Sequence, residues 1–372
     1  MIFMNEKYKK GIEVSPGTGI KKIMPISTSN TLFIGLTEKG SVNELRKISS
    51  FKEFQNLYGN IFEDYKLGYS VNGFFQNNGT NCYIIRVENI GIEEINNALN
   101  KIENRDINLI AIPDSKGSLE IAKEVIDFCE KNEHFFYIID PPMGLTPNEI
   151  IDLKNSNELN SSFASIYYPN IYIEKPLLKD QVLVPPSGFI AGAYSRNDLN
   201  RGVWKAPAGR DVEIIGATRL EQDINNSEME DLSFENINVI RILQNKILVW
   251  GAKTLEKDTD MEYIATKRLL IFIKQSILKG LQWCIFEPNN ETLWAKIRSI
   301  IFEFLTKLWR NGALQGTIPE KAFYIVCDGS INRDDIIKEG KVLIELGIAA
   351  LKPAEFIRFN IEIFAGKEHK GK

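Results

Sequence analysis

The chain has 372 residues, of which 44% are hydrophobic and 25% charged, and its formal net charge is −4 at pH 7. This length suits two domains better than one core, and the composition is ordinary for a globular protein. The small negative charge argues against direct nucleic-acid binding, which usually requires a strong positive field.

Neither a signal peptide nor a membrane contact is expected. The apolar start, Met1–Met4, is shorter than the apolar region of a signal peptide. No uninterrupted apolar run approaches the roughly 20 residues that cross a bilayer. We therefore expect synthesis and folding in the cytoplasm. The four cysteines are widely separated, which predicts buried free thiols: Cys82, Cys129, Cys284 and Cys327.

The first 26 residues are expected to form an arm. Lysines outnumber acidic residues in this segment, and Pro16 and Pro25 interrupt any long element. Ile12 and Val14 could support short extended pieces. The segment has too little apolar surface to fold alone.

From residue 31 the sequence alternates between strand and helix patterns. Ser49 or Ser50 can cap a helix that starts at Phe51, and Pro147 opens another helix. The expected strands are 31–36, 82–87, 107–112, 135–139 and 163–168, and the expected helices are 51–58, 69–75, 92–102, 119–129 and 147–153. Strands separated by helices of about ten residues predict an α/β sheet with right-handed crossovers.

Residues 180–238 are rich in Gly and Pro and predict little regular structure apart from a helix near 190–196. The C-terminal third is more regular. Thr259 and Glu262 predict a capping box for a helix over 261–279, and apolar residues at helical spacing predict a second helix over 293–309. Strands are expected within 239–250 and at 283–286, 323–327 and 342–348.

The last regular segment alternates apolar and polar residues. Ile357, Phe359, Ile361 and Ile363 are apolar, and the residues between them are polar. Period-two alternation predicts a strand with one dry face and one wet face. Such a strand must join an existing sheet, which can belong to its own chain or to a neighbour. In the second case the protein would polymerise.

The sequence offers few residues for catalysis or metal binding. It has only two histidines: His134, expected beside a strand, and His369 in a polar tail. No serine lies in a nucleophile-elbow motif, and the cysteines and histidines lack metal-ligand spacing. The loop at 16–22 lacks phosphate-loop spacing. We therefore expect no catalytic residue, no metal and no cofactor, with an α/β hydrolase-like enzyme as the alternative from another class.

Basic residues lie on the long predicted helix. They are Lys296, Arg298, Lys307 and Arg310. A solvated helix face is the usual explanation for such residues. The functional alternative is contact with an acidic protein surface, in which charge sets the register.

Several segments, in order along nearly the whole chain, resemble one known family. They are FIGLTEKG at 33–40, ISSFKEFQNLYG at 48–59, VPPSGFIAGAYSRND at 184–198, VWGAKTL at 249–255, LWRNGALQG at 308–316 and PAEFI at 353–357. Each motif alone is modest, whereas their order and spacing together are specific. The chain thereby resembles the contractile tail sheath proteins of phages and of related contractile injection systems.

The resemblance implies a mixed α/β, two-domain tail-sheath fold with extended arms that complete the sheets of neighbouring subunits. It implies an N-terminal arm at 1–26, an outer α/β domain at 27–234, an inner tube-facing domain at 235–352, and a C-terminal strand arm and tail at 353–372. The strand arms would contain Ile12 and Val14 at one end and Ile357, Phe359, Ile361 and Ile363 at the other.

The implied function is that of a structural subunit. It would polymerise around an inner tube and contract to drive the tube through a target envelope, in a phage tail or an injection particle. Its implied partners are further copies of itself, the inner tube protein, and baseplate and terminal cap proteins. Candidate tube contacts are Lys296, Arg298, Lys307 and Arg310. A non-contractile scaffold protein is a further alternative.

Overall fold

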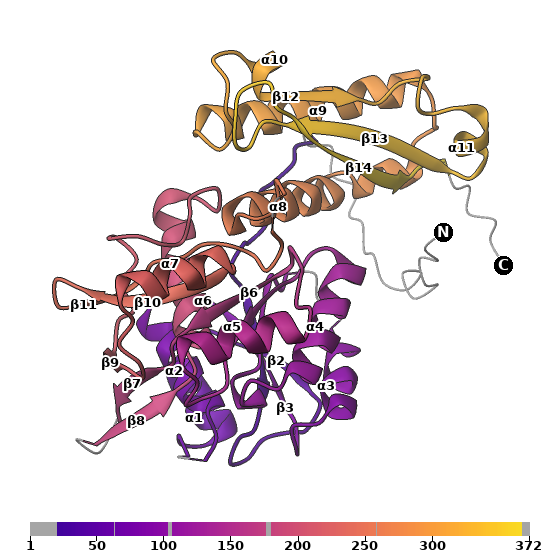
Figure 1. Ribbon diagram of the computed structural model, residues 1–372. Helices are drawn as coiled ribbons and strands as arrows, with labels where there is room; N and C mark the ends of the chain where they lie inside the picture. Colours follow the sequence, from indigo (N-terminus) through magenta and orange to yellow (C-terminus); the bar gives the residue numbers. More distant parts are fainter. Residues whose placement is uncertain (1–20, 63, 103–105, 176–179, 258, 367–372) are drawn as a thin grey trace. The chain divides into compact units, whose positions relative to one another are not determined.

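The computed structural model describes residues 21–62, 64–102, 106–175, 180–257 and 259–366. These residues form two compact units (Figure 1). The larger unit is Pro25–Gln275, and the smaller unit joins the described residues up to Met24 to those from Ser276 onwards. The boundary falls inside helix α8 (Ile264–Gly280). Each unit is described separately.

An eight-stranded sheet forms the centre of the larger unit, with the order β11-β10-β6-β5-β4-β1-β3-β2. Its strands are β1 (Thr31–Gly35), β2 (Leu45–Ile48), β3 (Cys82–Arg86), β4 (Leu109–Ala111), β5 (Phe136–Ile139), β6 (Ala164–Tyr168), β10 (Ile237–Leu243) and β11 (Lys246–Val249). The six inner strands are parallel, and β2 and β11 pair antiparallel at the edges. The expected α/β sheet is confirmed.

Helices cover both faces of this sheet (Figure 1). They are α1 (Phe51–Tyr58), α2 (Leu67–Gln76), α3 (Ile92–Leu99), α4 (Leu119–Asn132), α5 (Pro147–Ser156), α6 (Ser187–Arg201) and α7 (Asn226–Phe234). On β1, Phe33 packs into one core, and Leu32 and Ile34 pack into the other. Burial on both faces explains why the strands appear in the sequence as continuous apolar runs. The predicted cap at Ser50 is present, since its side chain accepts from the Glu53 N–H.

Residues 180–238 are more regular than expected. They contain β8 (Gln181–Val184), α6, β9 (Ala217–Leu220) and α7, and β7 (Ile171–Glu174) joins β8 and β9 in a three-stranded sheet. The glycines of α6 serve packing rather than turns. A Cβ at Gly188 would lie 2.3 Å from the Ser70 carbonyl oxygen, and one at Gly192 would lie 2.5 Å from that of Phe74. These two glycines therefore allow α6 to lie against α2.

The smaller unit contains a three-stranded antiparallel sheet with the order β12-β13-β14. Its elements are η3 (Gln282–Phe286), α9 (Glu291–Arg310), α10 (Pro319–Ala322), β12 (Phe323–Val326), α11 (Asp334–Lys338), β13 (Lys341–Ile348) and β14 (Ile357–Phe364). Helix α9 buries the apolar stripe that predicted it, which is Leu293, Ile297, Ile301, Phe304, Leu305 and Leu308.

Two local predictions were wrong. The strand expected at 283–286 is the 3-10 turn η3, because a short apolar run does not distinguish strand from helix. The helix expected from residue 261 begins at Ile264. Thr259 and Glu262 instead form the turn before it, in which the Glu262 N–H donates to the Thr259 carbonyl over 3.1 Å.

The boundary between the two compact units follows Gln275, whereas the expected boundary between the outer and inner domains lies between residues 234 and 235. Strand β10 pairs in parallel with β6, and β11 pairs with β10, so both strands belong to the larger unit. This long-range pairing leaves no trace in local periodicity.

Among the described residues, the segment Ile264–Phe286 is long and apolar enough to cross a membrane by length and composition alone. Its charged residues favour a core helix instead. Arg268 is only 3% exposed and pairs with Asp198 of α6 at 2.5 Å. The Arg268 guanidinium also donates to the Thr28 carbonyl over 3.0 Å. A buried charge is tolerated when it is paired and hydrogen-bonded in this way.

Two buried aspartates follow β4 and β5, and each binds a backbone N–H group at the start of a helix. Asp114 accepts from the N–H of Lys66 before α2 and from that of Leu36, the latter over 2.8 Å. Asp140 accepts from the Ser187 N–H of α6 over 2.8 Å, while its Oδ2 lacks a partner among the described residues. Burial raises the pKa of Asp140 to about 7 and also raises the pKa of Asp114.

All four cysteines are buried free thiols, as predicted. Burial raises the pKa of the Cys284 and Cys327 thiols to about 12. It also raises the pKa of Cys82 and Cys129.

The first prediction concerns Asp140. Because its pKa in the folded chain lies above the unfolded value of about 3.9, its contribution to stability is greatest at low pH and is lost as the pH rises through about 7. Asp140→Asn keeps the acceptor for the Ser187 N–H. We expect it to stabilise the protein by about 4 kcal/mol at pH 8 and to have little effect at pH 4. Urea unfolding of both proteins at the two pH values measures this. An equal effect at both values would contradict the assignment.

Candidate assembly interface

Strand β14 has the dry face that its sequence predicts. Ile357, Ile361 and Ile363 are buried, and Phe359 is half-buried. They lie opposite the buried residues of β13: Ile348, Ile344, Val342 and Leu346, respectively. Helix α9 runs along the sheet and η3 contacts β14 (Figure 1). The four alternating residues therefore belong to the core of the smaller unit.

Of the two sheets that could receive this strand, its own chain supplies one. All eight residues of β14 pair with β13 in an unbroken antiparallel register. Strand β14 is nevertheless the last strand in the sheet, so its other edge has no strand partner among the described residues. The Ile12 and Val14 arm lies outside the described residues.

The opposite side of β13 is closed by a side chain. Strand β12 pairs with β13 only over Glu345–Ile348, and the amide of Asn332 takes the next place. The Leu343 N–H donates to Asn332 Oδ1 over 2.7 Å, and Asn332 Nδ2 donates to the Leu343 carbonyl over 3.0 Å. The Asn332 side chain therefore binds the N–H and C=O of Leu343, which would otherwise pair with a neighbouring strand.

These bonds also reveal which backbone groups reach the open edge of β14. Leu343 points its N–H and C=O away from β14, and neighbouring strand residues alternate in direction. The bond from the Ala365 N–H to the Gly340 carbonyl follows the same alternation. The backbone groups of the four apolar residues of β14 thus face β13. Those of Arg358, Asn360 and Glu362 face the open edge.

The wet face of this sheet carries both charge signs. Lys341 lies 2.9 Å from Glu339 and 3.5 Å from Glu362 of β14, and both carboxylates raise the pKa of Lys341. The Tyr324 hydroxyl donates to Glu345 over 2.9 Å, and burial raises the pKa of Tyr324. These side chains link adjacent strands on this face.

The four basic residues of α9 do not form one free patch. Lys296 lies 4.8 Å from the centre of the Trp283 ring. Half-buried Arg298 donates to the Cys327 carbonyl and pairs with Glu291 at 2.9 Å. Lys307 pairs with Glu303 at 2.8 Å, whereas the side chain of Arg310 is exposed. Lys296, Lys307 and Arg310 are exposed and only Arg298 is half-buried, so three of the four charges reach the surface, each in a different setting.

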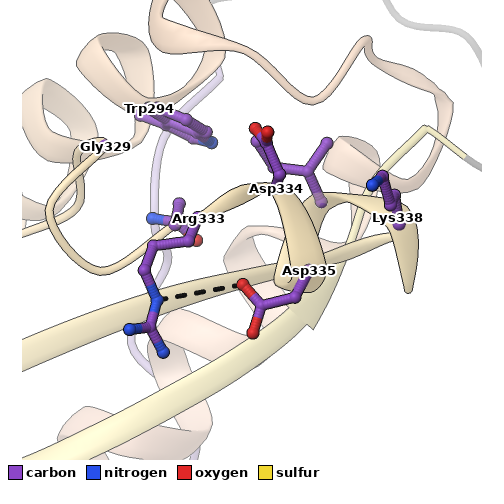
Figure 2. A pocket seen from close by; sticks show the side chains of 8 residues that line it. Trp294, Gly329, Arg333, Asp334, Asp335 and Lys338 are labelled. Carbon is purple, nitrogen blue, oxygen red and sulfur yellow. Dashed lines mark ion pairs between the residues drawn. The ribbon is translucent and has the colours of Figure 1, made fainter.

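A shallow open depression in the smaller unit is shown in Figure 2. Trp294, only 6% exposed, lines it together with Gly329, and Arg333 lies 3.8 Å from Asp335. Asp334 and Lys338 lie at the same depression and are exposed. These charges are solvated and do not converge on a point, unlike the groups of a catalytic site.

Other places for chemistry are equally plain. In the described part of the chain, no group of three or more His, Cys, Asp and Glu residues could hold a metal ion. His134 lies just before β5, where the sequence predicts it, with Nδ1 2.8 Å from the Asn132 carbonyl oxygen. At the end of β1, where doubly wound sheets often bind ligands, Asp114 fills the space: a Cβ at Gly35 would lie 2.5 Å from its Oδ2.

Two family models match consecutive parts of the chain. Residues 88–255 match the phage tail sheath protein central domain, and residues 256–364 match the phage tail sheath C-terminal domain.

Two curated proteins are similar over about half of the chain. The chain is 22% identical over 182 residues to a prophage major tail sheath protein of Pseudomonas aeruginosa, and 26% identical over 180 residues to the tail sheath protein of Vibrio phage KVP40. Each match covers 48% of this chain, but only 46% and 26% of the respective relative. The matched part is thus less than half of either relative.

Solved structures match nearly the whole chain. The anti-feeding prophage baseplate has a chain with a TM-score of 0.76 and 27% identity, covering 96% of this chain and 99% of that one. The sheath of an extracellular contractile injection system, PVC, in the contracted state has a TM-score of 0.76 and 26% identity, and the match covers 97% of this chain and 99% of that one. The contracted helical sheath of the anti-feeding prophage has a TM-score of 0.74 and 28% identity, and the match covers 93% of this chain and 98% of that one.

The second prediction concerns Asn332. Asn332→Ala would leave the half-buried N–H and C=O of Leu343 without their Asn332 partner, so we expect a loss of about 2 kcal/mol in the free energy of unfolding. Asn360→Ala, at an exposed position of the same sheet, is the matched control and should change stability by less than about 0.5 kcal/mol. Urea unfolding measures both. Equal stability of the two variants would show that the Asn332 amide does not support the sheet.

Proposed function

The chain belongs to the phage tail sheath protein family and is a structural sheath subunit, and we propose that it polymerises around an inner tube and contracts. The two family domains together span residues 88–364. Relatives that match nearly the whole chain come from contractile injection systems, including a helical sheath in the contracted state. We further propose that the protein is made in the bacterial cytoplasm, has no enzymatic activity, and meets inner tube, baseplate and terminal cap proteins.

The observation that supports the assembly contact is the open edge of β14. We propose that a strand of a neighbouring copy, from the arm that contains Ile12 and Val14, adds to this edge. Unpaired backbone groups at a sheet edge favour such β-augmentation. The apolar residues Ile357, Phe359, Ile361 and Ile363 would then hold the accepting strand on its own unit. The alternative is that β14 itself is donated, since an identical neighbour would offer the same β13 partner.

The smaller unit is the proposed tube-facing part, and the larger unit is the proposed outer part. Of the three exposed basic residues on α9, Arg310 is the best candidate for tube contact, because Lys307 pairs with Glu303 and Lys296 lies beside the Trp283 ring. Arg298 is the weakest candidate because it is bound to Glu291 and to the Cys327 carbonyl.

The contraction mechanism needs two packings of the same subunit. If the contracted lattice buries more surface per subunit than the extended one, each subunit releases interface free energy on contraction. A gain of a few kcal/mol per copy would add up along the sheath. Pairing between strands of adjacent copies would keep the subunits connected while their rigid bodies move.

The third prediction tests the open edge. Asn360→Pro removes an N–H that faces outwards, so the pairing of β14 with β13 is preserved. We expect the variant to fold but to form no tubes in negative-stain electron microscopy. Asn360→Ala keeps the N–H and should assemble normally. Normal tubes from Asn360→Pro would argue against pairing at this edge.

A disulfide distinguishes edge pairing from strand donation. Glu345 and Asn360 lie directly opposite each other on β13 and β14. The double variant E345C/N360C, when oxidised, would fix β14 to its own chain. Tubes from the oxidised protein are expected for edge pairing, whereas assembly only after reduction would favour donation.

The fourth prediction concerns the tube. Arg310→Glu should reduce co-sedimentation of the sheath with its tube by about tenfold if the residue meets an acidic surface. Arg298→Gln is the matched comparison on the same helix. It should mainly lower stability, because it removes the internal bonds to Glu291 and Cys327. If tube binding by Arg310→Glu is unchanged, the end of α9 is simply a solvated surface.

A further inference from the structure

The described chain begins at Lys21, and its first residues are bound to the smaller unit by specific contacts. The Lys21 ammonium lies 2.6 Å from Glu287 Oε1 and 3.7 Å from the centre of the Trp283 ring. The hydrogen bond from Lys21 lowers the pKa of Glu287. Lys21 is thus held by an ion pair and by a cation–π contact at the same time.

The same aromatic ring is shared with α9. Lys296 lies 4.8 Å from the centre of the Trp283 ring. The Glu287 carboxylate lies next to Lys21, and the charge of Lys296 also lowers the pKa of Glu287, so both ammonium groups interact favourably with the same carboxylate. The indole of Trp283 therefore joins the N-terminal segment to the helix that carries Lys296.

A glycine provides the apolar part of this attachment. Ile23 is only 7% exposed. A Cβ at Gly280 would lie 2.7 Å from Ile23 Cγ1, so the missing side chain leaves the space that Ile23 occupies. Lys22 adds a weaker contact with Glu303, at 3.9 Å. Each of the three residues Lys21, Lys22 and Ile23 thus has its own partner on the smaller unit.

We propose that Trp283, Glu287, Lys296 and Gly280 form a clamp that fixes where the N-terminal arm leaves the smaller unit. Lys296 is then a positioning residue for the arm rather than a tube contact. This inference rests on the proposed function for the role of the arm, but the clamp itself concerns contacts within one chain.

The clamp sets the point from which the arm extends. Each residue between Lys21 and the point where the arm binds a second copy adds at most about 3.5 Å of reach. A released clamp would lengthen the arm and slacken the link.

Limited digestion of the full chain with trypsin, followed by mass spectrometry, tests the clamp. The rate of cleavage after Lys21 and Lys22 reports local release of the segment, because cleavage follows the population of the opened form. We expect Trp283→Leu to raise this rate about tenfold and Lys296→Met about threefold. Trp283→Phe keeps an aromatic ring and should remain close to the parent protein. Arg310→Met removes a cation from the same helix away from Trp283 and should have no effect.

Two outcomes would overturn the clamp. The first is parental cleavage rates in both Trp283→Leu and Lys296→Met. The second is an equal increase at all sites in both variants, which would make the ring an ordinary core residue. Tube formation by the parent protein, scored separately by electron microscopy, tests the sheath proposal. Faster cleavage after Lys21 and Lys22 in the Trp283→Leu and Lys296→Met variants, with no tubes from the parent protein, would retain the clamp and reject the proposed polymerisation. Tubes from the parent protein, with parental cleavage rates in both variants, would support polymerisation and reject the clamp.

Discussion

A β-strand has two hydrogen-bonding edges, and β14 uses only one of them within its own chain. The interpretation of the smaller unit depends on this constraint. The apolar side chains of β14 pack in the core, and the backbone groups of the same residues pair with β13, so the strand is held on its own chain. Its outward groups, at Arg358, Asn360 and Glu362, are available to another strand. On the far side of β13, Asn332 occupies the position next to Leu343. A further strand can therefore add only beside β12 or β14, the outer strands of this sheet.

The larger unit has the architecture of many α/β enzymes, but side chains of its own fill the sheet edge where such enzymes bind ligands. Asp114 and Asp140 use their carboxylates to bind backbone N–H groups around α2 and α6, where an enzyme would receive a phosphate or a substrate. Gly188 and Gly192 let α6 pack closely on α2 at that side of the sheet. Among the described residues, the two carboxylates therefore stabilise the packing of these helices at this edge.

Local patterns predicted the elements whose own residues determine them. Strand β14 has one wet face, so its period of two is visible, and α9 shows the helical period for the same reason. The order of the motifs indicated the family. Features that depend on distant partners were missed. Helix α6 was predicted too short because its glycines look like turn residues, and the residues that they approach lie more than a hundred positions earlier. The roles of Lys296 and Arg298 could not be predicted either, because Trp283 and the Cys327 carbonyl meet them only in the fold.

The burial of all four thiols has a practical consequence for observing the particle at work. Their raised pKa values keep them protonated at neutral pH, and the thiolate is the form that reacts with maleimides. A single cysteine introduced at an exposed position would therefore accept a fluorophore selectively, without removal of the native cysteines. Energy transfer between dyes on adjacent copies could then follow the shortening of a sheath in real time.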